Sequence, residues 1–469
     1  MSIIVGAHTA FDVHVPVVVI GAGACGLCAA LAARDAGVNV LVLERDARAA
    51  GSTALSSGFI PASFTRFQRE AGITDSAEQF AADIQRKNHG ETDAAYALHV
   101  ARESGPTIDW LADRHGIEFI VLDGFLYPGH SARRMHAVPE QTGAALMTRL
   151  ETAAHAAGVD FLMQAQVTAL IVDESRPDHP ARVRGVRYVR PDGVTESVGC
   201  DALVLACSGF GGNAALVREH LPEIACARYF GHVGNQGDAI SWGRALGAAI
   251  HHLGAYQGHG SVAAPHGILI TWALMAEGGI QLNRRGERFA NEQQGYSEAA
   301  MSVLAQPEGI AWDVYDERLH RLGLGFEDYR QAEAAGAVRR ADSAAALAQL
   351  IGAPVDTVAR TLGEAAALTQ AGQRDRFGRD FSVKPALIPP YYAIRVTGAL
   401  FHTQGGLMID HDARVLRDDG SMMPNLFAGG GAACGVSGAG VSGYLSGNGL
   451  LAAVTLGRLA GASAARRAT

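Results

Sequence analysis

Residues 17–44 read VVVIGAGACGLCAALAARDAGVNVLVLE, and this stretch sets the fold class. An apolar run over residues 17–20 leads into three glycines with the spacing G-x-G-x-x-G. A helical pattern follows, and a second apolar run ends in Glu44. A strand, a glycine turn, a helix and a second strand in this order are typical of a Rossmann unit.

Each glycine of this turn has a physical role. Gly21 permits the tight turn from strand to helix, Gly23 lets a pyrophosphate approach the backbone, and Gly26 lets the helix pack close to the strand. The start of the helix offers free N–H groups and the positive end of its dipole to phosphates. Glu44 stands where a carboxylate accepts hydrogen bonds from a ribose. The stretch therefore predicts a dinucleotide site.

Two further glycine-rich segments favour FAD over NAD. Residues 51–58, GSTALSSG, are small and suit a loop beside a flavin, and residues 425–430, NLFAGG, suit a C-terminal strand returning to the Rossmann unit. Residues 438–443, GAGVSG, repeat the glycine spacing without an acidic strand end, so we interpret them as a loop against the flavin ring. We expect non-covalent FAD, because no attachment histidine stands between Glu44 and the loop of residues 51–58.

Composition excludes several function classes. The chain has 469 residues, 48% of them hydrophobic, which is enough for two or three domains. A net charge of −8 without a basic block argues against nucleic-acid binding. No apolar run approaches the ~20 residues that span a bilayer, and no signal peptide is evident, so we expect a cytoplasmic protein. The cysteines do not suggest a disulfide framework, and no metal-ligand spacing occurs.

Several segments come in the same order as in a known superfamily. They are GSTALSSG (51–58), NRRGERFANE (283–292), PPYYA (389–393), HTQGG (402–406) and NLFAGG (425–430). On these motifs nearly the whole chain resembles the fumarate reductase/succinate dehydrogenase flavoproteins, a superfamily that includes the 3-ketosteroid dehydrogenases. The resemblance implies an α/β fold with a Rossmann-type FAD-binding domain, residues 1–255 and 404–469. An α+β capping domain, residues 256–403, is inserted into it.

The resemblance also implies which residues surround FAD. Besides the glycines of the first turn and Glu44, they are Ser52, Thr53, Ser57, Gly58, Val167, Gly209, Gly430 and Ser446. Residues 1–13 look like a variable lead-in, and alanine-rich patterns predict helices over residues 342–350 and 354–373.

The chain departs from the fumarate reductases where those enzymes hold a dicarboxylate. Their proton-donating arginine, eight residues after the Arg of the G-x-R-F segment, corresponds to Tyr296. The arginine of their last glycine-rich loop corresponds to Tyr444. Their proton relay falls on Trp272 and Met275, neither of which carries protons. Buried carboxylates need such cations as partners, so a different substrate is expected.

Tyrosine in place of the arginine is what 3-ketosteroid dehydrogenases show. By this resemblance, Tyr296 removes a proton beside a ketone, helped by His402, because a free phenol has a pKa of about 10. The backbone N–H of Gly440 polarises the carbonyl. Tyr444 assists there, since Val436 replaces a tyrosine of those enzymes.

Further candidate residues carry weaker signals. His259, Tyr392 and Phe59 are candidate substrate contacts. Arg133 and Arg134 are expected to face the solvent, and the alternative is that one of them meets a substrate carboxylate.

These residues lead to two main hypotheses. The first is an FAD-dependent dehydrogenase (desaturase) that introduces a C=C bond α,β to the carbonyl of a cyclic ketone, by α-proton abstraction and β-hydride transfer to flavin N5. Its substrate resembles 4-oxocyclohexanecarboxylate or a 3-ketosteroid, and the short chain favours the smaller ring. The alternative is a fumarate reductase-like ene-reductase acting on an activated alkene, with Tyr296 as proton donor. Oxygen, a quinone or another redox protein is the electron partner. A non-catalytic flavoprotein is disfavoured by the intact glycine loops.

Overall fold

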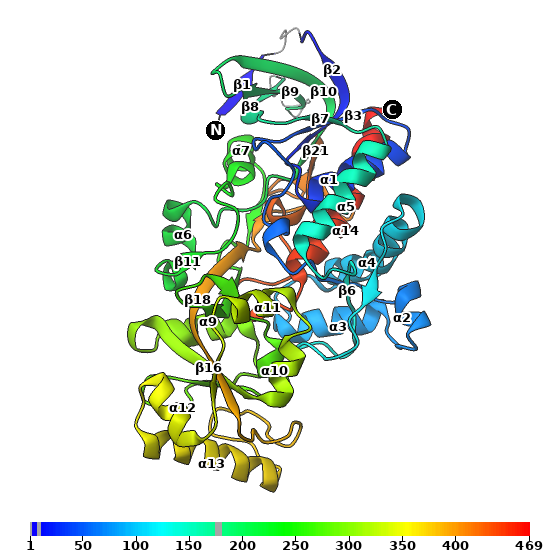
Figure 1. Cartoon of the computed structure of the whole chain (residues 1–469). Helices are drawn as coiled ribbons and strands as arrows, with labels where there is room; N and C mark the ends of the chain where they lie inside the picture. Colours follow the sequence, from blue (N-terminus) through cyan, green and yellow to red (C-terminus); the bar gives the residue numbers. More distant parts are fainter. Residues whose placement is uncertain (1, 7–10, 174–180) are drawn as a thin grey trace.

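The computed structural model describes residues 2–6, 11–173 and 181–469 (Figure 1). A nine-stranded sheet lies toward one end of the molecule, and a seven-stranded sheet lies toward the other. The two chain ends are both at the nine-stranded sheet. Within the described residues, no helix combines the length and the apolar character needed to cross a bilayer.

Parallel strands form the centre of the nine-stranded sheet. In spatial order they are β21 (Met422–Ala428), β10 (Thr195–Leu205), β2 (His14–Ile20), β3 (Val40–Leu43) and β7 (Asp160–Leu162). The valines, isoleucines and leucines at the centre of β2 and β10 are buried, as strands covered on both faces require. The pairing of β21 with β10 confirms the predicted C-terminal return to the Rossmann unit.

The first half of β10 pairs instead with β9 (Val183–Val189), which pairs with β8 (Gln166–Val172). Strand β1 (Ser2–Val5) lies parallel beside β8, with Ser2 opposite Ala169. The predicted variable lead-in therefore contains an ordered strand, and the variability of its sequence stays a prediction. The short SIIV run suits an edge strand.

The first and last helices pack against each other beside this sheet (Figure 1). They are α1 (Ala24–Asp35) and α14 (Asn448–Ala468). A Cβ at Gly461 would lie 2.0 Å from the carbonyl oxygen of Ala29, so glycine permits this close approach. The C-terminal helix thus buries the helix that follows the first glycine turn.

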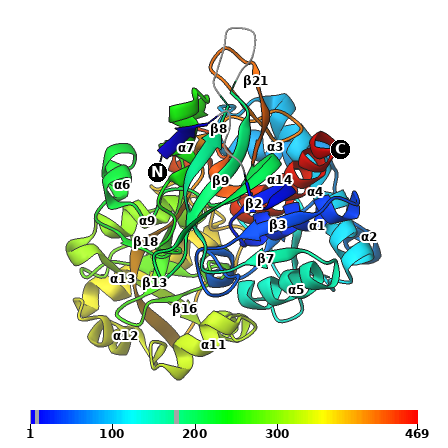
Figure 2. The same cartoon turned by 90° about the horizontal axis from the view of Figure 1, so that it is seen from above.

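The seven-stranded sheet is built mainly from residues 256–403 (Figure 2). Its long strand β18 (Tyr391–Thr403) lies between β13 (Tyr256–Ala263) and β16 (Ile310–Asp316). The shorter strands are β11 (Arg228–Tyr229), β14 (Ile268–Leu269), β15 (Ile280–Leu282) and β17 (Arg339–Ala341). The sheet therefore includes one short strand, β11, from the segment before residue 256.

Helices flank this second sheet. They are α8 (Ala273–Ala276), α9 (Tyr296–Leu304), α10 (Glu317–Gly323), α11 (Glu327–Ala334), α12 (Ala344–Ile351) and α13 (Val355–Ala371). The last two confirm the predicted alanine-rich helices. Helix α9 lies on β13, where a Cβ at Gly258 would be 2.7 Å from the Ala300 side chain.

The remaining elements are β4 (Ile60–Pro61), α2 (Arg66–Glu70), α3 (Ala77–Lys87), α4 (Ala94–His115), β5 (Ile120–Val121), β6 (Met135–Ala137), α5 (Gly143–Ala156), α6 (Ala214–His220), α7 (Asp238–Leu246), β12 (Ile250–His251), β19 (Gly406–Leu407) and β20 (Arg414–Leu416). Of these, β20 pairs with β21 as the ninth strand of the nine-stranded sheet, and the others lie outside the two large sheets. All six cysteines are free thiols.

Candidate active site

A crevice opens where β2 ends at the glycine turn. A Cβ at Gly21, whose φ is +103°, would lie 2.6 Å from the carbonyl oxygen of Ala206. One at Gly26 would lie 1.8 Å from the carbonyl oxygen of Gly21. At Gly23, by contrast, a Cβ would meet no atom within 4 Å. The outer two glycines thus serve the turn and its packing, whereas Gly23 leaves room for a ligand.

A buried carboxylate lies beside this turn. Glu44 accepts the backbone N–H of Ala22 at 2.8 Å and that of Asp46 at 2.9 Å, which fixes its orientation. The N-cap residue of α1 is Gly23, which has no side chain to cap the helix, and the first N–H, that of Ala24, makes a long bond of 3.4 Å to the Thr53 hydroxyl. An uncapped helix start suits phosphate oxygens, and the carboxylate suits a ribose. The residues therefore fit FAD.

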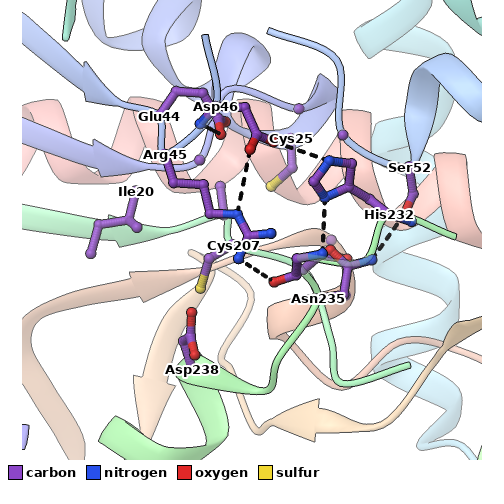
Figure 3. Close-up of a pocket in the computed structure, with 18 of the residues that line it drawn as sticks. Ile20, Cys25, Glu44, Arg45, Asp46, Ser52, Cys207, His232, Asn235 and Asp238 are labelled. Carbon is purple, nitrogen blue, oxygen red and sulfur yellow. Dashed lines mark hydrogen bonds and ion pairs between the residues drawn. The ribbon is translucent and has the colours of Figure 1, made fainter. Parts of the chain in front are cut away.

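The opposite wall of the crevice comes from residues 232–235 (Figure 3). The His232 ring nitrogen Nε2 lies 3.0 Å from Asp46. The Ser52 hydroxyl accepts the backbone N–H of His232 at 3.0 Å and the Asn235 amide at 2.9 Å. These bonds tie the wall to the loop after β3. Residue spacing did not predict this wall, because the sequence carries no motif for it.

Most predicted FAD residues lie at this crevice. Those that line it are Gly21, Gly23, Glu44, Ser52, Thr53, Val167 and Gly430. Gly26 lies behind it as a packing residue. Gly209 is not in the lining, so its contact with FAD stays a prediction. A Cβ there would lie 2.0 Å from the Thr403 hydroxyl, so glycine serves the contact with β18.

A second pocket adjoins the crevice at Ser52, which lines both. Its walls come from the loop after β3, from β13, from the start of α9, and from the loop before α14. The predicted residues that line it are Ser57, Gly58, Phe59, His259, Tyr296, His402, Tyr444 and Ser446. The pocket thus lies between the two sheet-based parts, as active sites commonly do.

Two tyrosines face each other in this pocket. The rings of Tyr296 and Tyr444 have their centroids 6.0 Å apart with their planes at 60°. Burial raises the pKa of Tyr296 to about 12, although the neighbouring Ser446 and Tyr444 hydroxyls oppose the rise. Burial also holds the pKa of Tyr444 well above its ordinary value, and its hydroxyl accepts the Gly449 N–H at 3.4 Å. Both side chains are therefore neutral phenols near pH 7.

The two histidines of the pocket are also uncharged. His259 stacks on Tyr296 with ring centroids 4.7 Å apart. Its Nδ1 accepts the backbone N–H of Ser261 at 3.1 Å, so the hydrogen resides on Nε2. Burial lowers the pKa of His259 to about 3 and that of His402 to about 4. The Nδ1 of His402 accepts from the Gln404 amide at 2.9 Å.

The pocket lining carries no formally charged side chain. Among the described residues that form it, none is Asp, Glu, Lys or Arg. Trp272 lines the wall, and its indole N–H donates to the carbonyl of Glu292 at 3.2 Å; Met275 is buried behind it. The nearby Arg288 is paired with Glu292 and Asp375. Such a lining suits uncharged groups and offers no partner to a carboxylate.

The predicted carbonyl donor Gly440 is not among the residues that line the pocket. In the 438–443 loop, the N–H of Ala439 donates to Glu91 at 2.7 Å. The roles of Gly440 beside a carbonyl and of this loop beside the flavin ring stay predictions. Gly447, four residues after the end of that loop, lines the pocket instead.

Tyr392 also lies outside the pocket, contrary to prediction. It stands ten residues before His402 on β18, which at about 3.3 Å per residue is roughly 33 Å along the strand. Its ring stacks on His320 at 4.3 Å between centroids, and its hydroxyl donates to Glu317 at 2.6 Å. Packing explains this tyrosine.

A segment without any recognisable motif in the sequence completes the pocket. Tyr127 and Met135 line it, and the Tyr127 ring lies 6.5 Å from that of Tyr296.

Arg134 is 1% exposed, so the prediction that it faces the solvent is wrong. Its partners Asp75 and Asp83 permit this burial, and they come from a different part of the chain.

Named relatives resemble the chain over nearly its whole length. It is 29% identical over 466 residues to the NADH:fumarate oxidoreductase of Klebsiella pneumoniae (strain 342), a match that covers 99% of this chain but about half, 49%, of that protein. It is 26% identical over 547 residues to the 4-oxocyclohexanecarboxylate 2-dehydrogenase of Sinomonas cyclohexanicum, covering 96% of this chain and 93% of that one. Other relatives are named as reductases of fumarate, urocanate or acrylate.

A solved structure and a family profile agree with this similarity. The 3-ketosteroid Δ4-(5α)-dehydrogenase of Rhodococcus jostii RHA1, solved with 4-androstene-3,17-dione, superposes with a TM-score of 0.79. The two chains are 26% identical, and the match covers 99% of this chain and 100% of that one. The profile described as FAD binding domain matches residues 16–450. The chain belongs to the FAD binding domain family of flavoproteins.

Proposed function

We propose that the protein is an FAD-dependent oxidoreductase acting on the carbon–carbon bond next to the carbonyl of an uncharged cyclic ketone or enone. One observation carries the proposal. A pocket that adjoins the FAD crevice presents two neutral tyrosines and two neutral histidines, with no Asp, Glu, Lys or Arg among its described lining residues. The relatives' names support oxidoreductase chemistry on CH–CH groups.

Because no Lys or Arg is among the described lining residues, the pocket favours a substrate without a negative charge. A carboxylate buried without a cationic partner loses its hydration without compensation. Tyr296 and Tyr444 occupy the positions of the two arginines that fumarate reductases use. We therefore favour an uncharged ring over fumarate, and also over the ring carboxylate that the length of the chain suggested.

In the proposed reaction, two neutral side chains donate hydrogen bonds to the carbonyl oxygen and a third transfers a proton. The Tyr444 hydroxyl accepts from Gly449, so its own hydrogen is available to a carbonyl oxygen. The Nε2–H of His259 is a second donor, because its Nδ1 is occupied by Ser261. Two such donors would stabilise negative charge on that oxygen, and Tyr296 would transfer the proton at the α-carbon. FAD, when bound, exchanges hydride with the β-carbon.

The neutral phenol of Tyr296 is the form that the reductive direction requires. A phenol with a pKa of about 12 holds its proton at neutral pH and can deliver it, whereas a base must first lose it. Most relatives are also named as reductases. We therefore propose enone reduction as the main reaction. Dehydrogenation of the ketone is the second candidate, supported by the likeness to two dehydrogenases over nearly their whole lengths.

An anaerobic flavin experiment tests the proposal. The reduced holoprotein is mixed with cyclohex-2-enone or fumarate, and the oxidised form with cyclohexanone, while flavin absorbance is recorded. We expect the enone to restore the oxidised spectrum, and Tyr296→Phe to abolish this. Tyr392→Phe is a matched control, since it removes the same hydroxyl outside the pocket. Bleaching by cyclohexanone alone would favour the second candidate. Reoxidation by fumarate alone would refute the proposal.

A further inference from the structure

A buried ion cluster lies behind the pocket. The Arg134 side chain is fully buried and makes a two-point contact with Asp75, Nη2 to Oδ1 at 2.7 Å and Nε to Oδ2 at 3.0 Å. It also pairs with Asp83, and its guanidinium lies 4.6 Å from the Phe80 ring centroid. A charge so fully compensated is fixed in place. None of these residues lines the pocket.

The cluster contacts one neutral histidine. Arg134 Nη1 lies 3.1 Å from His130 Nδ1, and an arginine can only donate. His130 Nδ1 is therefore the acceptor, and the hydrogen resides on Nε2. That Nε2 lies 3.0 Å from the carbonyl oxygen of Ser446 and donates to it. Burial, reinforced by Arg134, lowers the pKa of His130 to about 3. The ring is thus a neutral link of fixed orientation.

This link ends in the segment that shapes the pocket. Ser446 follows Tyr444 by two residues, and both residues line the pocket together with Tyr296. Gly447, with φ +85°, then precedes α14. On the far side, the Asn448 amide donates to the Ser437 hydroxyl at 3.0 Å. The His130 bond is the contact that ties the Ser446 carbonyl to the ion cluster.

We propose that Arg134 and His130 are positioning residues, which hold the Ser446 carbonyl and thereby set the Ser446 and Tyr444 hydroxyls against Tyr296. The inference rests on the proposed function for the role of Tyr296 in proton transfer. Its physical basis is geometric, since a displacement of about 1 Å at a reacting group can lower a rate about 100-fold. Neither residue is expected to touch the substrate.

Kinetics of two His130 variants test the proposal in the holoenzyme. His130→Leu removes both hydrogen bonds, whereas the amide of His130→Gln can still accept from Arg134 and donate to Ser446. We expect kcat to fall about 10- to 100-fold in the first variant, with KM changed less than about twofold, and to recover largely in the second.

His136→Leu is the matched control. His136 is equally buried and bonds to the Arg134 carbonyl at 2.9 Å and to Thr65 at 2.7 Å, but it has no bond to the 444–447 segment. We expect this variant to lose stability and keep its kcat. An unchanged kcat in His130→Leu, or an equal loss in His136→Leu, would overturn the proposal.

A crystal structure of FAD-loaded His130→Leu provides a test that needs no substrate. We expect the Ser446 carbonyl to shift and the Ser446 and Tyr444 side chains to move relative to Tyr296. An unmoved segment would overturn the positioning role. If no ketone or enone reacts with the wild-type protein, the proposed function fails, yet this structure still decides the positioning.

Discussion

The FAD crevice and the adjoining pocket differ in the charge of the side chains that line them. The crevice uses backbone N–H groups, glycines and polar side chains such as Glu44, Asp46 and Asn235. The pocket uses aromatic rings and neutral hydroxyl and imidazole groups. The two meet at Ser52. Charged side chains thus line the crevice but not the described part of the pocket, and this contrast leads to testable predictions.

The largest expected effect comes from the pocket. Tyr296→Phe keeps the ring and its stacking on His259 but removes the proton donor. We expect kcat to fall about 10²- to 10⁴-fold, the usual contribution of general acid–base catalysis. FAD content should be unchanged, because Tyr296 does not line the crevice. Stopped-flow reoxidation of the reduced flavin by an enone measures the change. A loss below about threefold would remove Tyr296 from the chemistry.

Two alanine variants in the glycine turn distinguish the effect of a glycine on protein stability from its effect on FAD binding. Gly26→Ala places a methyl group 1.8 Å from a backbone oxygen, so we expect lost FAD and about 1–3 kcal/mol of destabilisation. Gly23→Ala meets no protein atom and has an ordinary φ of −73°.

We therefore expect Gly23→Ala to weaken FAD binding at least about tenfold while the apoprotein unfolds at the wild-type temperature. Fluorescence titration with FAD and thermal unfolding of the apoproteins measure both effects. Equal destabilisation of the apoprotein by the two variants would contradict the assigned roles.

Activity and stability should respond differently to pH. His259 and His402 have lowered pKa values of about 3 and about 4, so kcat should stay flat from about pH 5 to 8. On unfolding, these rings regain an ordinary pKa of about 6.5 and take up protons below it. Stability should therefore fall as the pH drops from about 6.5 toward about 4. Paired kcat and urea-unfolding series check this. A kinetic pKa near about 6.5 that disappears in His259→Gln would show a charged histidine in the pocket.

The smallest effect concerns a carboxylate placed just behind the pocket. Asp313 accepts from the Ser261 hydroxyl and from Gln281, yet burial raises its pKa to about 7. Between an unfolded pKa of about 3.9 and this value, the native state holds a proton that the unfolded chain releases, so this group lowers stability as pH rises. Asp313→Asn should gain at least about 1 kcal/mol at about pH 8 relative to about pH 5. Urea unfolding measures the difference, and a gain independent of pH would contradict the raised pKa.

The two sites also differ in how far the sequence predicts them. The crevice rests on a local strand–turn–helix unit, so the roles of Gly21, Gly26 and Glu44 could be read from residue spacing alone. Tyr296 and Tyr444 were found because they stand at fixed distances from motifs. The fold followed from the same motifs.

The placement of Gly440 and Arg134 depends on contacts between distant segments, whereas that of Tyr392 depends on its distance along β18. Gly440 has the right glycine spacing, but its loop bonds to Glu91, almost 350 residues earlier, and it is not among the residues that line the pocket. Arg134 looks like a surface cation until Asp75 and Asp83 are placed beside it. Tyr392 sits on the same strand as His402, but far along it. Spacing in the sequence contains none of this information.

The proposed preference of the pocket for uncharged substrates can be measured with one matched pair of compounds. The reduced holoenzyme is mixed anaerobically with 4-oxocyclohex-2-ene-1-carboxylate or with its methyl ester, and the second-order rate constants of flavin reoxidation are compared. The two compounds share the ring and the enone and differ in the carboxylate. We predict that the ester reacts at least about tenfold faster, a difference of about 1.4 kcal/mol. A faster reaction with the carboxylate would contradict an uncharged substrate.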